Sequence, residues 1–357
     1  MYELDRKRQE TMASIKRYTT NVNYNIYSMD VLYDYNLDAV MSSGFQCENQ
    51  LREAIFKDAL GTTKSNAELK LSTFGCTAFK IGAKGQNQIR MGRNYDFKDD
   101  TSVMLVHCPR ITDGGKVRRY ASVGFAALSN ISLNNDVEKK EECLVAPYIC
   151  LDGINENGVA IAVLTLDGTP VHETVPGRKQ LSTTLAIRLV LDQAVSAPDA
   201  LARLTQYNMV AFGEKDYHFY ITDKNGFAYV LEYTYDDAKH CRSRAIQATD
   251  AVTNFFISYK DMALGVNPPW RYGHGQDRYV KAKRALSTWN GNDINGTAWN
   301  ILKETSQLPE SGTLTSNTQW SIVYNNTART AEFAFRRNFG DVWMYNLTAN
   351  SFGRKPY

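Results

Sequence analysis

Two groups of strand-like segments, with a pair of helices between them, constrain the fold of this chain more than any other feature. Short apolar runs bounded by turn residues predict strands, and leucine- and alanine-rich patterns predict helices over 180–195 and 196–209. The predicted strand regions are 73–82, 87–97, 102–110, 120–128 and 145–168 before the helices, and 217–233, 247–258, 316–337 and 341–347 after them. This order is typical of a layered α+β domain, in which two antiparallel sheets pack together and helices lie outside them.

The first 75 residues have a different character and are predicted to be mostly helical. Residues 3–22 are charge-rich with spaced apolar positions, and residues 49–63 have apolar side chains at helical spacing before Gly61, a typical helix stop. The tyrosine-rich stretch 23–44 between them predicts a strand followed by a short helix. The only change in composition along the chain falls near residues 70–75.

Composition and charge narrow the class of protein. Of the 357 residues, 43% are hydrophobic and 22% are charged, which is ordinary for a soluble globular protein, and the net charge is only +3. No basic tract is long enough for a nucleic-acid arm, so nucleic acid and anionic membranes are disfavoured as partners. The apolar run Gly158–Leu166 is far shorter than the ~20 residues that a membrane helix needs. The polar N-terminus lacks the apolar core of a signal peptide, which favours a cytoplasmic protein unless a leader has been removed.

Cysteine and histidine spacing predicts neither a disulfide framework nor a metal site. The six cysteines are scattered without a C-x-x-C pair, and the five histidines make no ligand-like spacing. We therefore expect no metal ion. Buried thiols and partly exposed imidazoles are the expected roles of these side chains, with Cys76 as the exception.

Cys76 heads one strand-like run, and a second run with charged residues follows it closely. The two runs flank the turn-like sequence AKGQNQ, which predicts a hairpin. Antiparallel pairing would place Cys76 opposite Tyr95 and bring Arg93 and Asp96 within a few residues of the thiol.

A cysteine in this setting can act as a nucleophile if a base activates it. The thiol has an unperturbed pKa of ~8.5, and a nearby arginine favours its thiolate form. No histidine lies near Cys76 in the sequence, although folding could bring one close. The alternative base is the α-amine that Cys76 would own if the chain were cut after Gly75, since such an amine has a pKa of ~7.7–8.0. Residues 1–75 would then be a propeptide.

Several segments together resemble a known family. They are CTAF, GRNYDF, LDGINENGVAIAVLTLDG, LSTTLAIRLVLDQA, HFYITDKNGFAYVLEY, AVTNFF and TQWSIVYN, in this order over about residues 71–335. They are similar to the choloylglycine hydrolase and penicillin acylase group, and to the wider linear amide hydrolases that include penicillin acyltransferases and acid-ceramidase-like amidases. The resemblance implies an N-terminal nucleophile (Ntn) hydrolase fold, a four-layer αββα sandwich, in a catalytic domain of residues 76–357. It also implies autocatalytic release of the cysteine and hydrolysis of a small-molecule acyl amide without a cofactor.

The resemblance implies a role for each residue that matches a family motif. Cys76 would be the nucleophile, freed by cleavage between Gly75 and Cys76, and its amine would be the base. Asp96 would hold the amine or the thiol, while Arg93 would fix the carboxylate and raise the local positive potential. Asn254 matches an asparagine that donates an N–H to the oxyanion.

Two further matches are less close. Arg278 is favoured over Lys281 as the counterpart of a late arginine in the family. Thr165 stands where bile-salt hydrolases carry asparagine and penicillin acylases carry tyrosine, so its backbone N–H is the group expected to serve.

The long prefix bears on the substrate. Seventy-five residues before Cys76 resemble the acid-ceramidase and penicillin acyltransferase side of the group more than the bile-salt hydrolases. The expected substrate is a linear non-peptide amide: an N-acyl amide, a conjugated bile salt or a penicillin-like compound. An acyltransferase and a non-catalytic ligand-binding protein on the same scaffold are the alternatives, and a homo-oligomer is left open.

Overall fold

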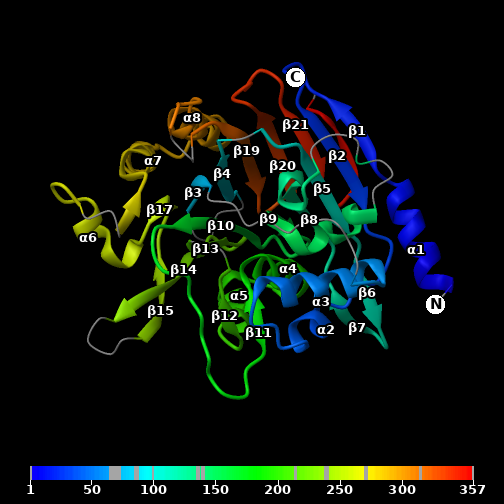
Figure 1. The fold of residues 1–357 in the computed structure, drawn as a ribbon. Helices are drawn as coiled ribbons and strands as arrows, with labels where there is room; N and C mark the ends of the chain where they lie inside the picture. The colour runs from blue at the N-terminus through cyan, green and yellow to red at the C-terminus, as the bar shows by residue number, and fades with distance from the viewer. Residues whose placement is uncertain are drawn as a thin grey trace.

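Two large β-sheets form the centre of the molecule, and helices lie on their outer sides (Figure 1). The computed structural model describes residues 2–63, 74–83, 88–98, 100–133, 137, 141–212, 215–236, 241–268, 272–312 and 316–355. The predicted arrangement of strands, helices and strands is confirmed.

The larger sheet has nine strands in the order β1-β2-β5-β8-β9-β10-β13-β14-β15. Every neighbouring pair is antiparallel except β2 and β5, which are parallel. The strands are β1 (Lys16–Thr19), β2 (Asn25–Asp30), β5 (Val103–Cys108), β8 (Ser122–Ala127), β9 (Cys150–Asn155), β10 (Ala160–Leu166), β13 (Asp216–Thr222), β14 (Ala228–Asp236) and β15 (Cys241–Ala248).

The smaller sheet has seven strands in the order β16-β3-β4-β19-β20-β21-β22, and all its neighbours are antiparallel. The strands are β3 (Gly75–Ile81), β4 (Arg90–Asp96), β16 (Ala251–Val252), β19 (Thr318–Asn325), β20 (Thr330–Phe335), β21 (Trp343–Asn346) and β22 (Ser351–Arg354). Cys76 therefore lies on the second strand from one edge of this sheet.

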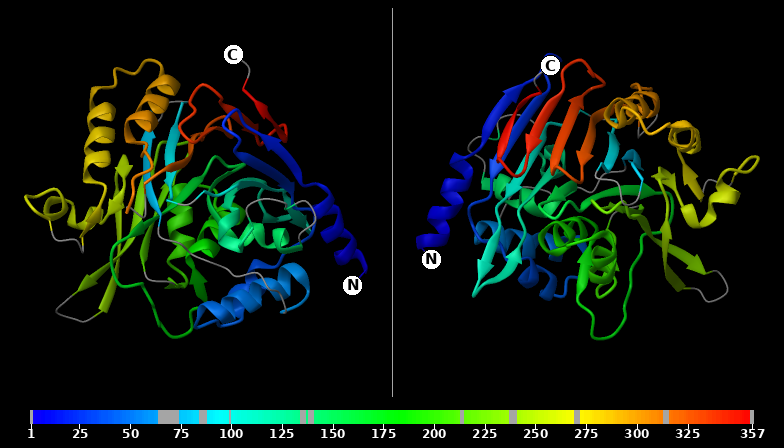
Figure 2. Two further views of the ribbon diagram at one scale, coloured as in Figure 1. Left: turned by 45° about the horizontal axis from the view of Figure 1, so that its top comes forward. Right: turned by 180° about the vertical axis from the view of Figure 1, so that it is seen from behind.

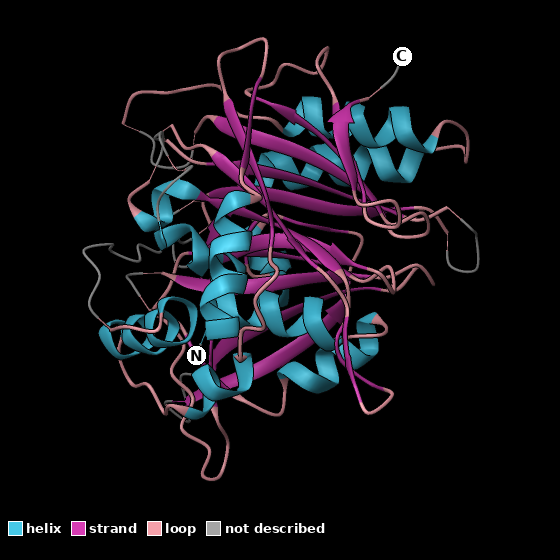
Figure 3. Cartoon of the chain, turned by 90° about the vertical axis from the view of Figure 1, so that its right-hand side faces the viewer, coloured by secondary structure: helices cyan, strands magenta, loops and turns pink. Residues whose placement is uncertain are grey.

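The layers follow from which helices cover which sheet. Helices α4 (Thr183–Gln193) and α5 (Ala197–Leu204) pack on the larger sheet, and α7 (Gln276–Thr288) and α8 (Ile294–Thr305) pack on the smaller one. Strand β10 contacts α4 on one face and β3 on the other, which is why the whole of Ala160–Leu166 is buried and apolar apart from Thr165. Figure 3 shows the strands between two outer groups of helices. The expected αββα sandwich is confirmed.

Local chemistry explains several helix ends. Ser196 is the N-cap of α5 and accepts a hydrogen bond from the Asp199 N–H at 3.2 Å, and Gly61, the expected helix stop, ends α3 (Glu48–Leu60) with a φ of 74°. The helix expected over 3–22 is shorter than predicted, because α1 (Tyr2–Ala13) stops where Ser14 accepts a hydrogen bond from the Asp30 N–H at 2.9 Å. The chain then continues as β1. Helix α8, which the sequence patterns did not reveal, is a further difference.

The segment before Gly75 is built into the sheets. It forms α1, β1, β2, α2 (Leu37–Ser42) and α3, and β2 extends the larger sheet by pairing with β5. Its strands also lie beside the C-terminal strands (Figure 2), where the Tyr18 ring packs against Phe352 at 4.6 Å between centroids. The segment therefore shares a hydrophobic core with the rest of the chain.

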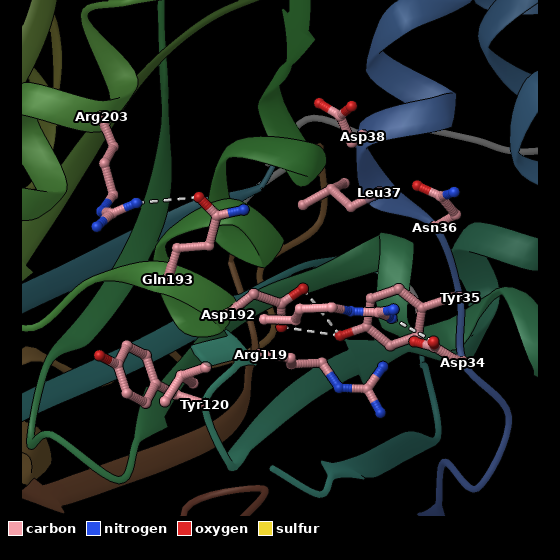
Figure 4. Close-up of a pocket in the computed structure, with 12 residues that line it drawn as sticks. Asp34, Tyr35, Asn36, Leu37, Asp38, Arg119, Tyr120, Asp192, Gln193 and Arg203 are labelled. Carbon is pink, nitrogen blue, oxygen red and sulfur yellow. Dashed lines mark hydrogen bonds and ion pairs between the residues drawn. The ribbon is translucent and has the colours of Figure 1, made fainter. Parts of the chain in front are cut away.

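A polar junction joins this segment to the outer helix layer (Figure 4). The Tyr35 hydroxyl donates to the Asp192 carboxylate at 2.8 Å, and the same carboxylate pairs with Arg188 at 2.7 Å. The Arg119 guanidinium lies over the Tyr35 ring at 4.3 Å from its centroid. A cavity of about 580 Å³ opens at this junction, on the side of the larger sheet away from β3.

The remaining elements are short. They are β6 (Ile111–Asp113), β7 (Lys116–Arg119), β11 (Gln180–Ser182), β12 (Asn208–Val210), β17 (Asn254–Phe255), β18 (Gly273–His274), α6 (Lys260–Ala263), and the 3-10 helices Leu128–Ile131, Glu141–Ile149 and Ile257–Tyr259. Among the residues described, no helix combines the length and the hydropathy that crossing a membrane would require.

Candidate active site

The β3–β4 hairpin has the predicted register. Cys76 pairs with Tyr95, Ala78 with Arg93 and Gly75 with Asp96. Because paired residues share a face and faces alternate along a strand, Cys76 and Arg93 lie on one face of the sheet. Asp96 lies on the opposite face, so only the arginine meets the thiol directly.

Arg93 links the thiol to a buried carboxylate. Its Nη2 lies 3.4 Å from the Cys76 Sγ and donates to the Val163 carbonyl at 3.0 Å, while its Nη1 pairs with Asp152 at 2.6 Å. All of these side chains are fully buried. Burial raises the pKa of the Cys76 thiol to about 12, and the positive charge of Arg93 opposes this rise.

Asn254 and Thr165 hold the chain on both sides of Gly75. The Asn254 Oδ1 accepts a hydrogen bond from the Cys76 N–H at 2.8 Å, and its Nδ2 donates to the carbonyls of Thr165 at 2.9 Å and Phe74 at 3.3 Å. The Thr165 hydroxyl also donates to the Phe74 carbonyl. The Thr165 side chain thus contacts the site, where only its backbone was expected to do so.

Arg278 lies on the other face of the hairpin, with Asp96. Its Nη1 donates to the Cys76 carbonyl and lies 3.6 Å from the Asp96 Oδ2, and its Nη2 donates to the Asn254 Oδ1 at 2.9 Å. Burial raises the pKa of Asp96, while the Arg278 charge opposes the rise. The alternative, Lys281, has a half-exposed side chain that pairs with Asp277 on the same helix.

The six residues singled out by the sequence are thereby brought together, although they come from distant segments. These residues are Cys76, Arg93, Asp96, Thr165, Asn254 and Arg278.

Sequence reasoning missed the groups that support them. Asp152 is the one charged residue of a fully buried strand, and that isolated charge was a usable signal. The Thr318 hydroxyl and the Gln307 amide donate to Asp96 at 2.6 and 2.7 Å. Thr318 begins the segment TQWSIVYN but was not assigned a role, and Gln307 comes from a segment with no distinctive pattern.

A buried histidine–glutamate pair holds the segment that carries Asn254. His218 lies 3.0 Å from the Glu232 carboxylate through Nδ1 and 2.9 Å from the Thr253 carbonyl through Nε2. Both partners are acceptors, so both contacts are satisfied only when both ring nitrogens carry protons. Glu232 also accepts from the N–H groups of Ile257 at 2.7 Å and Ser258 at 2.9 Å. Burial alone would raise the pKa of the Glu232 carboxyl. The hydrogen bond and charge of His218, together with the two backbone N–H groups, outweigh burial, so this pKa lies below its ordinary value.

This arrangement of sheets and site defines the class of the protein: it has the Ntn-hydrolase fold. Penicillin V acylase from Agrobacterium tumefaciens shares the fold with a TM-score of 0.55 and 19% identity, over 76% of this chain and 86% of the acylase. Two variants of conjugated bile acid hydrolase from Clostridium perfringens share it with TM-scores of 0.56 and 0.57 and 15% identity. Each comparison covers 79% of this chain and 97% of the hydrolase.

Part of the sequence matches a known family. Residues 76–240 match the family described as linear amide C-N hydrolases, choloylglycine hydrolase family. Over these residues the chain is similar to hydrolases of carbon–nitrogen bonds in linear amides. No curated protein matches its sequence.

Proposed function

We propose that the chain is a self-processing cysteine amidohydrolase, which cleaves a linear non-peptide amide through a thioester on Cys76. One observation carries the proposal: Asn254 holds the Cys76 nitrogen and Arg93 contacts its sulfur, so both atoms of the expected N-terminal nucleophile are bound. The family match supports it too, because that match begins at Cys76.

Self-cleavage would be an acyl shift followed by hydrolysis. The Cys76 sulfur attacks the Gly75 carbonyl carbon, the Gly75–Cys76 carbon–nitrogen bond breaks, and the thiol proton moves to the departing nitrogen. Water then hydrolyses the Gly75 thioester, which leaves a carboxylate on Gly75 and a free thiol and amine on Cys76. Arg93 stabilises the thiolate, and the absence of a Cβ on Gly75 lets the sulfur approach the carbonyl.

The mature reaction would repeat this chemistry on a substrate amide. The free amine of Cys76 takes the thiol proton, the sulfur attacks the substrate carbonyl, and the amine product leaves with that proton. Water then hydrolyses the thioester, which releases the acid and restores the Cys76 thiol. Asn254 Nδ2 and the Thr165 hydroxyl donate to the Phe74 carbonyl in the uncut chain. Once Phe74 and Gly75 withdraw, the Asn254 Nδ2 becomes free to stabilise an oxyanion, and one such donor is worth ~3–4 kcal/mol of barrier.

Mass spectrometry of the purified protein tests the proposal. We expect the 40.3 kDa chain to yield fragments of about 8 and 32 kDa, in proportion to residues 1–75 and 76–357, with Cys76 at the new N-terminus. Cys76→Ala should stay whole and inactive. An uncut chain that hydrolyses acyl amides at full rate would contradict self-processing. Adding an amine acceptor separates the alternative, because an acyltransferase would yield a new amide in place of the free acid.

A further inference from the structure

Phe74, the second residue before the proposed cut, fills an aromatic pocket beside the active site. Its side chain is only 1% exposed. Its ring centroid lies 5.4 Å from that of Tyr95 and 6.0 Å from that of Tyr217, both at tilted angles. These two tyrosines come from different sheets, Tyr95 from β4 and Tyr217 from β13. The pocket therefore lies between the two sheets, on the same face of the hairpin as the thiol.

The backbone carbonyl of Phe74 is held by side-chain hydrogen bonds, as a ligand carbonyl would be. The Phe74 carbonyl accepts from the Thr165 hydroxyl and from the Asn254 Nδ2. Gly75, between this carbonyl and Cys76, is buried and has no side chain. From Cys76 outward, the site thus holds a methylene, an amide carbonyl and an aromatic ring.

The chemistry of self-cleavage relates the bound residues Phe74 and Gly75 to the acyl group of a substrate. If the proposed acyl shift occurs, its thioester carries the acyl group that ends in Phe74 and Gly75. An external amide with the same acyl group would form the same thioester on Cys76. A site that hydrolyses this thioester once, during its own maturation, has the means to hydrolyse it again during turnover.

We infer that the mature enzyme accepts amides of N-acylglycines whose acyl group ends in a phenyl ring. This inference rests on the proposed function and names its substrate class. The simplest such acyl group is 3-phenylpropanoylglycyl, which reproduces Phe74 and Gly75 without the amine of Phe74. The ring occupies the pocket of Tyr95 and Tyr217, and the inner carbonyl accepts a hydrogen bond from the Thr165 hydroxyl. The glycyl carbonyl is the one attacked: sulfur displaces the amine, which leaves with the thiol proton, and water releases the acylglycine.

Three 4-nitroanilides test the inference with the self-cleaved enzyme. They are the 3-phenylpropanoylglycyl, butanoylglycyl and decanoyl compounds, of which the second lacks the ring and the third also lacks the inner amide. Burying a phenyl ring favours binding enough that we expect the first to exceed the second in kcat/KM by ~10- to 100-fold. We expect it to exceed the third as well, because only the first two can engage the Thr165 hydroxyl with an inner carbonyl.

Variants of Tyr217 locate the ring. Tyr217→Leu should lower the ratio of kcat/KM for the phenyl compound to that for the butanoyl compound by ~5-fold or more, while Tyr217→Phe should keep the ratio. The ratio is taken within one preparation, so it does not depend on how much of a variant is folded. A ratio near one in the unaltered enzyme, or a ratio that Tyr217→Leu leaves unchanged, would overturn the inference. Hydrolysis of the decanoyl compound would then show that the proposed amidase function still stands. If enzyme with an N-terminal Cys76 hydrolyses none of the three, the inference and the proposed function both fail.

Discussion

At the residue scale, burial controls the chemistry of Cys76 in the uncut chain. The thiol is fully buried, and its pKa is raised to about 12 although Arg93 is in contact with it. At neutral pH the sulfur therefore carries its proton almost always. Below the pKa of an acid, the fraction of its charged form rises about tenfold for each pH unit.

The first prediction is that self-cleavage speeds up with pH. An uncut sample prepared below pH 6 should cut itself increasingly fast as the pH is raised toward 9, because attack requires the thiolate. The rate is measured from the appearance of the smaller fragment on a denaturing gel. Cys76→Ala serves as the control for proteolysis by a contaminant. A rate that is constant over this range would show that thiol ionisation does not limit the reaction.

The residues around the thiol also show which part of a site a sequence can reveal. Cys76, Arg93 and Asp96 were predictable because one hairpin carries them, and hairpin register follows from the turn. Asp152 was not assigned to the site, since its role depends on two strands from different sheets meeting face to face. The Thr165 hydroxyl was discounted because a family comparison considers residue identity, whereas its contact is with the backbone of Phe74.

At the scale of elements, the short crossover between β16 and β17 determines the position of the Asn254 side chain. The chain leaves the smaller sheet at Val252 and presents the Asn254 side chain to Cys76 two residues later. His218, on β13 of the larger sheet, binds the Thr253 carbonyl of this crossover. The pair of His218 and Glu232 therefore ties the position of Asn254 to the larger sheet.

The second prediction concerns this pair. His218→Gln should lower kcat by ~10- to 100-fold while KM changes little, because a small displacement of a catalytic group costs rate more than binding. Self-cleavage should slow in parallel. The matched control is Asp192→Asn, which breaks another buried ion pair on the far side of the larger sheet. That variant should lose stability yet keep its kcat per intact active site. Equal losses of kcat in both variants would show that His218 contributes only to stability and does not position Asn254.

Elements also differ in how far the sequence predicts them. Helix α4 and the β13–β14 hairpin were predictable because their apolar periodicity and turn residues are local. Helix α8 was missed, since its sequence INGTAWNILKET mixes glycine and asparagine with the apolar residues that pack on β4. The helix predicted over residues 3–22 was too long, because residues 16–19 form a strand only by pairing with β2.

At the scale of the whole molecule, the proposed propeptide is part of the fold. Strand β2 pairs with β5 through five residue pairs, from Ile26 with Val103 to Asp30 with His107. The Tyr33 hydroxyl donates to the Leu144 carbonyl, and the Tyr35 hydroxyl donates to Asp192. Cutting one peptide bond at Gly75 removes none of these contacts.

The last prediction follows from this: after self-cleavage, the two fragments stay together. Tyr27, Tyr33, Phe45 and Phe56 are fully buried or nearly so, and releasing the segment would expose each of them to water at ~1.5–3 kcal/mol per side chain. The cut enzyme should therefore elute in gel filtration at the volume of uncut Cys76→Ala, with both fragments in one peak. In urea the two should separate, and the larger fragment should lose its activity. Because β2 lies between β1 and β5, loss of the segment would leave β5 as an unpaired edge of the larger sheet. An active larger fragment that elutes alone in plain buffer would contradict this prediction, and it would show that residues 1–75 are needed only before the cut.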